Sequence, residues 1–319
     1  MADYLLFIPG LVFLIKGAEY LVKGSSAIAR RLNIPDLVIG LTIVSMGTSL
    51  PELVVNLYAS FSGSTEIAIG NVFGSNIANI LLILGVSAII NPLNIKSSTL
   101  LSEIPISLIA TLLVGFLANA ALFDTAANLM ISRPDGLILL FFFAVFMLYI
   151  YNLSRTHGEK PADSPEDAIP LHRSLIMIAG GIGALFLGGQ WVVSGAVRLA
   201  ILIGLSQSFI GLTVVAVGTS LPELVTSAVA AKRNNADIAV GNIIGSNIFN
   251  ILWILGISSV IRPLPFQVVS NLDILVMTGA TLMVILSVAV GRKNNINRIS
   301  GGIFILSYVC YIVFLVVRG

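Results

Sequence analysis

Long apolar stretches alternate with short polar ones along almost the whole chain. Each apolar stretch is about as long as a helix needs to cross a bilayer, roughly 20 residues, and is bounded by charged or turn-forming residues. We expect such spans at about 4–22, 36–61, 67–91, 103–122, 135–153, 173–200, 207–231, 238–261, 271–291 and 299–317. The pattern therefore predicts an all-α integral membrane protein with about ten transmembrane helices.

The one long polar segment divides this pattern into two halves. It covers residues 154–172 and contains several charged residues and three prolines, which is typical of a solvated linker. Residues 1–153 are accordingly predicted to form a first five-helix repeat and residues 173–319 a second one. The segment between them is predicted to be a cytoplasmic linker.

The two halves share two motifs at one constant spacing. Residues 40–56 read GLTIVSMGTSLPELVVN and residues 211–227 read GLTVVAVGTSLPELVTS, with 12 of 17 positions identical. Residues 68–85 and 239–256 are identical at 13 of 18 positions, and both pairs of segments are 171 residues apart. Two segments repeated in one register indicate internal duplication. Because each half has an odd number of spans, the second half is predicted to be inverted across the membrane, as in many secondary transporters.

Composition and charge agree with a chain that has the bilayer as its solvent. Of the 319 residues, 57% are hydrophobic and only 10% are charged, whereas a soluble domain carries roughly 25%. The net charge of +2 gives no reason to expect a nucleic-acid partner. With the N-terminus outside, 12 basic residues fall on the inner side of the predicted spans and 4 on the outer side. This asymmetry predicts a multi-pass protein of the cell membrane with both termini outside, which we expect to function as a monomer.

Two glutamates stand near the middle of predicted spans with no basic residue near them. Glu52 and Glu223 are equivalent in the repeats, each ending the sequence Gly-Thr-Ser-Leu-Pro-Glu. A carboxylate at this depth is costly unless it is paired, protonated or bound to a cation. Inversion would place the two on opposite sides of one centre, where a divalent cation would balance both. A third intramembrane acid, Glu19, is expected to pair with Lys16 or Lys23 on its own helix face.

The residues around the two glutamates offer oxygen ligands. Pro51 and Pro222 have no amide hydrogen, so we expect the helix to unwind before them and to free carbonyl groups. The second motif adds serine hydroxyls and asparagine amides one helical turn apart. Oxygen ligands of this kind suit calcium and sodium, and the absence of His and Cys among them argues against zinc or copper. The candidate ligands, besides the glutamates, are Ser45, Thr48, Ser75, Asn79, Ala216, Thr219, Ser246 and Asn250.

With these motifs the chain resembles the calcium/cation antiporter superfamily, and within it the prokaryotic sodium/calcium exchangers. The paired motifs match the two alpha-repeats of that family, and the spans extend the resemblance to nearly the whole chain. The resemblance implies sodium/calcium exchange by alternating access, three sodium ions for one calcium ion, and no cofactor beyond the transported ions. It implies a calcium site made by Glu52, Glu223 and the carbonyls of Thr48 and Thr219. The implied sodium sites use the same glutamates with Ser75, Ser246 and the carbonyls of Ser45 and Ala216, and Asn79 and Asn250 line the centre.

Other functions stay open at this point. A calcium/proton antiporter would carry protons on the same two glutamates, although the motif resembles the sodium-coupled branch. Potassium-dependent sodium/calcium exchange is a second alternative. Family members that move potassium resemble one another in having Asp where this chain has Asn250, although some archaeal exchangers also carry Asp there, and we expect exchange that does not need potassium. A channel explains inverted acidic repeats less well than an exchanger does. An enzyme is not expected, because both histidines, His157 and His172, lie in the predicted linker.

Overall fold

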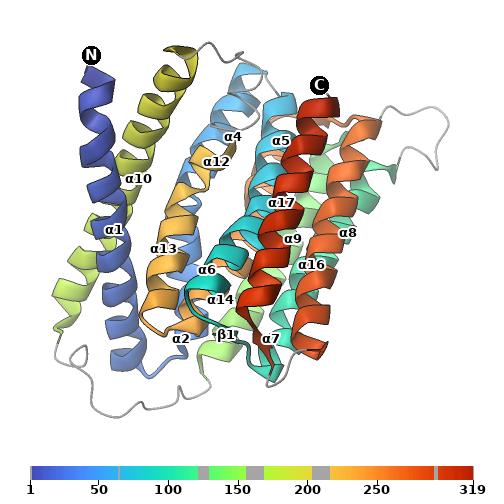
Figure 1. Cartoon of the computed structure of the whole chain (residues 1–319). Helices are drawn as coiled ribbons and strands as arrows, with labels where there is room; N and C mark the ends of the chain where they lie inside the picture. Colours follow the sequence, from blue (N-terminus) through green and yellow to red (C-terminus); the bar gives the residue numbers. More distant parts are fainter. Residues whose placement is uncertain are drawn as a thin grey trace.

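The computed structural model describes residues 2–63, 65–120, 129–155, 169–202, 216–290 and 294–318, which form a bundle of long helices (Figure 1). The helices of the first half are α1 (Ala2–Leu32), α2 (Asp36–Ile39), α3 (Ser45–Thr48), α4 (Leu50–Ser62), α5 (Thr65–Ile77), α6 (Leu84–Ile90), α7 (Ser97–Leu101), α8 (Glu103–Ala118) and α9 (Arg133–Ser154). Those of the second half are α10 (Leu171–Leu202), α12 (Ala216–Thr219), α13 (Leu221–Lys232), α14 (Ala236–Ile248), α15 (Gly256–Ile261), α16 (Asn271–Val290) and α17 (Arg298–Arg318). Most of the predicted linker, and the start of the span expected at 207–231, lie outside the described residues.

Short elements of other kinds connect these helices. Among the described residues, π-helical segments η1 (Gly40–Val44), η2 (Ala78–Ile83) and η6 (Phe249–Leu255) continue α-helices, and a 3-10 turn, η7 (Val268–Ser270), precedes α16. Strand β1 (Leu93–Asn94) pairs antiparallel with β4 (Asn295–Ile296), and β2 (Met130–Ile131) pairs antiparallel with β3 (Leu264–Pro265). Each two-residue ladder joins one half of the chain to the other.

The helical membrane fold is confirmed, while the count of ten spans stays a prediction. Among the described residues, seven helices are long and apolar enough to cross a bilayer, and an eighth span results if the bent pair 36–48 and 50–62 is counted as one. Helix α1, which carries Lys16, Glu19 and Lys23, is not among them. Helix α1 begins and helix α17 ends at the same end of the bundle (Figure 1), as an even number of membrane crossings requires.

Helices α1 and α10 pack against each other in opposite directions at one edge of the bundle (Figure 1). Glycines form the contact, because Gly10 lies against Gly188 and Gly17 against Gly181. A Cβ atom on Gly17 would come within 2.8 Å of the Gly181 carbonyl oxygen, so any larger residue would push the helices apart. Gly181 and Gly188 are the repeat equivalents of Gly10 and Gly17, so each contact is the counterpart of the other. This reciprocity supports the inverted arrangement of the two halves.

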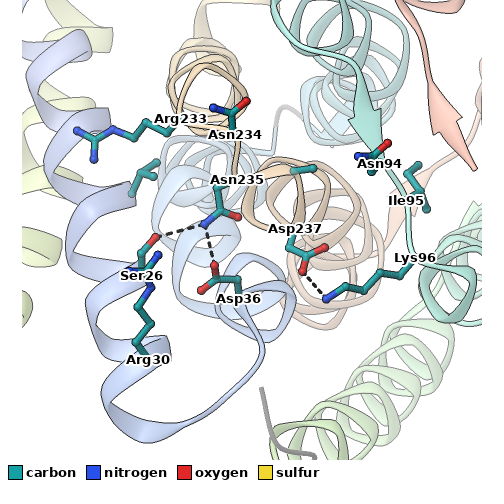
Figure 2. Close-up of a pocket in the computed structure, with 12 residues that line it drawn as sticks. Ser26, Arg30, Asp36, Asn94, Ile95, Lys96, Arg233, Asn234, Asn235 and Asp237 are labelled. Atoms are coloured by element: carbon teal, nitrogen blue, oxygen red, sulfur yellow. Dashed lines mark hydrogen bonds and ion pairs between the residues drawn. The ribbon is translucent and has the colours of Figure 1, made fainter. Parts of the chain in front are cut away.

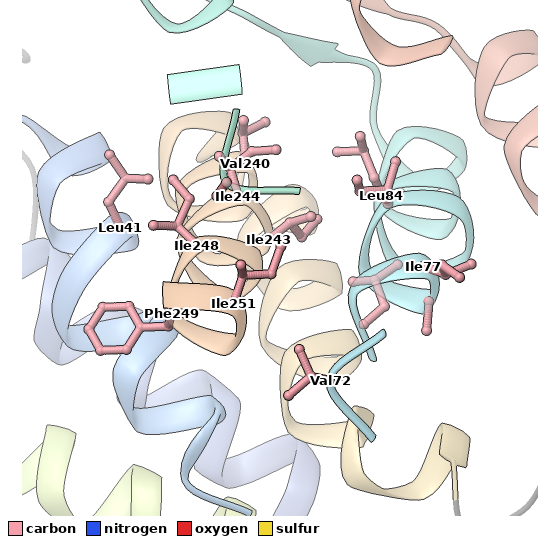
Figure 3. Close-up of a cluster of buried hydrophobic side chains, with 14 of the residues drawn as sticks. Leu41, Val72, Ile77, Leu84, Val240, Ile243, Ile244, Ile248, Phe249 and Ile251 are labelled. Carbon is pink, nitrogen blue, oxygen red and sulfur yellow. The ribbon is translucent and has the colours of Figure 1, made fainter. Parts of the chain in front are cut away.

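The bundle is apolar both inside and on its outer surface. Buried side chains surround α14 (Figure 3), where Ile243 and Ile248 are completely enclosed against Leu41 of η1 and neighbouring helices. On the outer faces, Phe141 of α9 and Leu306 of α17 expose 64% and 63% of their surface. A water-soluble protein rarely exposes large apolar areas, so these faces fit contact with lipid.

Candidate ion-binding site

Two broken helices meet inside the bundle. Ser49 separates α3 from α4, and the segments before and after it are bent by 49°. Ser220 separates α12 from α13 with nearly the same backbone angles, φ −87° and ψ 7° against φ −83° and ψ 8° at Ser49. Pro51 and Pro222 then occupy the first turn of the new helices, where a missing amide hydrogen is tolerated. The break predicted from the prolines is therefore confined to one residue in each repeat.

Glu52 and Glu223 follow the breaks and are completely buried, each at 0% exposure. Each carboxylate accepts a hydrogen bond from a serine of the opposite half. The Ser49 hydroxyl donates to Glu223 Oε1 at 2.8 Å, and the Ser220 hydroxyl donates to Glu52 Oε1 at 3.4 Å. These crossed bonds bring the two predicted glutamates into one site at the contact between the halves.

Two further serines, one from α5 and one from α14, also donate hydrogen bonds to the carboxylates. Ser75 donates to Glu52 Oε1 at 3.3 Å, and Ser246 donates to Glu223 Oε1 at 3.5 Å. The hydroxyl oxygens of Ser246 and Ser49 lie 3.0 Å apart. Both serines named from the sequence thus lie beside the glutamate of their own half.

Four asparagines, from α5 and η2 in the first half and from α14 and η6 in the second, form hydrogen bonds across the same contact. The Asn76 amide donates to the Asn247 carbonyl at 3.1 Å, and the Asn247 amide donates to the Asn76 carbonyl at 3.3 Å. Asn79 donates to Asn247 Oδ1 and Asn250 donates to Asn76 Oδ1, both at 2.9 Å. Every bond has its repeat equivalent, so the site has approximate two-fold symmetry. Asn79 and Asn250 lie within the π-helical turns, which are frequent at functional sites.

Four oxygen atoms of this cluster are buried and accept no hydrogen bond: Glu52 Oε2, Glu223 Oε2, Asn79 Oδ1 and Asn250 Oδ1. A buried acceptor without a partner costs about 1–3 kcal/mol, and more when it is charged. Within the described part of the chain, no Lys or Arg forms an ion pair with either glutamate. Because all four atoms come from groups that accept, a cation placed among them would satisfy them and neutralise the carboxylates.

The four candidate carbonyl ligands lie beside the breaks. Thr48 is completely buried, and its hydroxyl donates to the Ser45 carbonyl at 3.2 Å. That carbonyl also accepts the Ser49 amide at 3.0 Å, so the proline does not free it, contrary to expectation. The reason is that α3 stays helical through Thr48 and the break falls only at Ser49. Thr219 ends α12 and Ala216 begins it, and the side chain of Ala216 lies outside the described part.

A second layer of polar side chains holds the helices behind the site. The Asn71 amide donates to Asn56 Oδ1 at 2.7 Å, and the equivalent Asn242 amide donates to Ser227 Oγ at 2.9 Å. Thr48 Oγ1 donates to Asn242 Oδ1 at 3.0 Å and so connects this layer to the other half. Although Asn56 of the first motif is replaced by Ser227 in the second, each accepts a hydrogen bond from the equivalent asparagine, Asn71 or Asn242.

Glu19, the third acid expected within the membrane, is paired within its own helix. Lys16 Nζ lies 2.8 Å from Glu19 Oε2, and the two side chains are 59% and 37% exposed. The predicted ion pair is confirmed, with Lys16 as the partner. Glu19 is thereby neutralised, in contrast to the two glutamates of the site.

Sequence reasoning missed the part played by Ser49 and Ser220. Both stand inside the repeated motif, which is the signal that could have found them. The repeat shows which positions are equivalent, but it does not show that each serine reaches the glutamate of the opposite half. The same holds for Asn76 and Asn247, whose bonds also cross between the halves.

Comparison with known proteins agrees with this geometry. Residues 3–152 and 173–317 match the family described as sodium/calcium exchanger protein. The chain belongs to this family. It is 33% identical to the sodium/calcium exchanger MaX1 of Methanosarcina acetivorans over 98% of each chain. It is also 40% identical to the inner membrane protein YrbG of Escherichia coli K12, over 81% of this chain and 79% of that protein. A solved structure of the sodium-calcium exchanger NCX_Mj is similar with a TM-score of 0.81 at 32% identity, over 98% of each chain. The resemblance seen in the motifs is therefore confirmed.

Proposed function

We propose that the chain is a secondary antiporter that exchanges sodium for calcium at one site built around Glu52 and Glu223. The observation that carries this proposal is the set of four buried oxygens without hydrogen-bond partners, two from the glutamates and one each from Asn79 and Asn250. Two carboxylates supply a charge of −2, which one calcium ion balances. Oxygen ligands of mixed carboxylate, amide and hydroxyl character are those that calcium prefers.

Burial of the site supports alternating access over an open pore. The glutamates are 0% exposed and the two asparagines at most 1%, so in this conformation an ion at the site would be enclosed. An ion can then enter or leave only after one end of the molecule opens. That behaviour belongs to an exchanger, whereas a channel needs a path that is open to both sides at once.

The calcium site would add the carbonyls of Thr48 and Thr219. Sodium would use the same glutamates, with the hydroxyls of Ser75 and Ser246 and the carbonyls of Ser45 and Ala216 as further ligands. Because both ions then depend on the same carboxylates, they would compete for the site. Exchange of three sodium ions for one calcium ion would move one net charge, worth about 2.3 kcal/mol per 100 mV of membrane potential. We place the chain, as a monomer, in the cell membrane with both termini outside.

The family match favours sodium over proton coupling, while the role of potassium depends on Asn250. An asparagine at this position adds no third charge to the site, so a potassium ion would bring an unbalanced positive charge. We therefore propose exchange that does not need potassium.

Calcium-45 uptake into proteoliposomes tests these points when sodium, potassium and proton gradients are imposed one at a time. We expect uptake into sodium-loaded vesicles that responds to an imposed potential and proceeds without potassium. Uptake that follows the pH gradient and ignores sodium would contradict the proposed exchange. An absolute need for potassium would contradict the proposal for Asn250 alone.

A further inference from the structure

A second polar cluster lies at the end of the bundle where α1 ends and α2 begins (Figures 1 and 2). It surrounds a cavity of about 530 Å³ between both halves of the chain. We name it the inner cluster, because basic residues at this end predict that it faces the cytoplasm. It consists of Ser26, Asp36, Lys96, Asn235 and Asp237.

Asn235 is the centre of the inner cluster. Its amide nitrogen donates to Asp36 Oδ2 at 2.8 Å and to Ser26 Oγ at 3.4 Å (Figure 2). Its amide oxygen accepts from the backbone of Ile238 at 3.0 Å and so caps the start of α14. One side chain from the second half therefore binds both α1 and α2 of the first half.

An ion pair makes a second connection at the same turn. Lys96, which follows β1, lies 2.8 Å from Asp237 in the first turn of α14, and the side chains are 46% and 23% exposed. Beside this pair, the Asn91 amide donates to the Ala231 carbonyl at 3.1 Å and to Asn234 Oδ1 at 2.9 Å. The turn between α13 and α14 is thus held by several separate segments of the first half.

The sequence repeat does not carry over the first-half members of this cluster. The hydroxyl, carboxylate and ammonium groups that the first half contributes are all replaced at the positions 171 residues later. Ser26, Asp36 and Lys96 are matched there by Val197, Gln207 and Gln267. The three positions equivalent to Ser26, Asp36 and Lys96 therefore carry uncharged side chains.

We propose that the inner cluster is a latch that holds this end closed and must part before ions at the central site can leave through it. The inference rests on the proposed antiport, since alternating access requires each end to open in turn. The Asn235 bonds to Asp36 and Ser26 and the Lys96–Asp237 pair all join the two halves, so opening between the halves breaks them together. Because the first-half groups of this cluster are not repeated at the equivalent positions in the sequence, we expect the latch to favour the closed state at this end.

Two substitutions weaken the latch and leave the helices capped. Asn235→Asp keeps the side-chain oxygen that caps α14, since Asp and Asn cap equally well, but it sets a second carboxylate against Asp36. Lys96→Gln removes the ion pair. Lys16→Gln is the matched control, because Lys16 forms an ion pair of the same 2.8 Å length that stays within α1 and does not join the halves.

A buried reporter cysteine measures the opening of this end. Thr226 is completely buried on α13, about one turn beyond Glu223 in the direction of the latch. We would introduce Thr226→Cys into a chain whose exposed Cys310 is replaced by serine. The rate of maleimide labelling is then measured on the detergent-solubilised protein. In detergent the result does not depend on which end faces the cytoplasm.

We expect labelling to become about two- to five-fold faster with Lys96→Gln, the range to which a partly exposed ion pair shifts an equilibrium. Asn235→Asp should raise the rate at least as much, and Lys16→Gln should leave it unchanged. Equal rates in the reporter chain and both latch variants would overturn the proposal, and so would an equal rise with Lys16→Gln. Sodium-driven calcium uptake by the unchanged chain in proteoliposomes separates the two proposals, because its absence contradicts the antiport and leaves the labelling comparison intact.

Discussion

Substituting Glu52 by glutamine tests the ion-binding site most directly. Glutamine has nearly the shape of glutamate and keeps an oxygen that can accept from Ser220 and Ser75, so packing and hydrogen bonds persist and the charge alone is lost. A calcium ion would then face one carboxylate in a completely buried site. Removing one partner of a buried charge pair costs about 3–5 kcal/mol. At about 1.4 kcal/mol per factor of ten, calcium affinity should fall at least about a hundredfold.

Calcium-45 uptake into sodium-loaded proteoliposomes and equilibrium calcium binding in detergent both measure this loss. Glu103→Gln is the matched control, because Glu103 is a carboxylate with 1% exposure that accepts a hydrogen bond from Tyr149 and contacts no residue of the site by hydrogen bond. We expect the control to keep its uptake while Glu52→Gln has none at a calcium concentration that saturates the unchanged chain. A Glu52→Gln protein that binds calcium as tightly as the unchanged chain would refute a site built on two carboxylates.

Two further predictions concern the crossed serine bonds and the topology. Ser49→Ala removes the 2.8 Å bond to Glu223 and should lower calcium affinity about tenfold, since a hydrogen bond to a charged group is worth about 1.5–3 kcal/mol. Ser220→Ala, which removes a 3.4 Å bond, should cost less, and binding isotherms that rank the two variants in reverse would contradict this. After replacement of Cys310, a cysteine at Arg155 should react with an impermeant maleimide only from the cytoplasmic side. Labelling of intact cells at this position would show the predicted orientation to be wrong.

The central glutamates and the helix breaks could be predicted because they leave strong marks in the sequence. Glu52 and Glu223 stand in long apolar stretches without a basic neighbour, and each appears in a motif that occurs twice. The end of the first helix was harder to predict. We expected it near residue 22, but α1 continues to Leu32. Charged residues such as Lys23 end an apolar stretch without ending a helix, since their long side chains can reach water from the last turns.

Contacts between the halves could not be predicted from the repeat. A constant offset identifies which residues are equivalent, but the partner of Asn79 is Asn247 and that of Ser49 is Glu223, neither of which is its equivalent. The π-helical turn around Asn79 also has no local pattern that sets it apart from an α-helix. These features depend on how two helices from distant parts of the chain meet.

The asparagine bonds across the centre have a consequence for how the protein is synthesised. While a ribosome is still producing the second half, the side-chain amides of Asn76 and Asn79 in the inserted first half have no Asn247 to bind. Unpaired amides are unfavourable in hydrocarbon, so helix α5 cannot settle into its final position until the segment around Asn247 has entered the membrane. We therefore expect the centre to assemble only after the second half has been inserted, and a chain terminated before Asn247 would leave these amides unpaired.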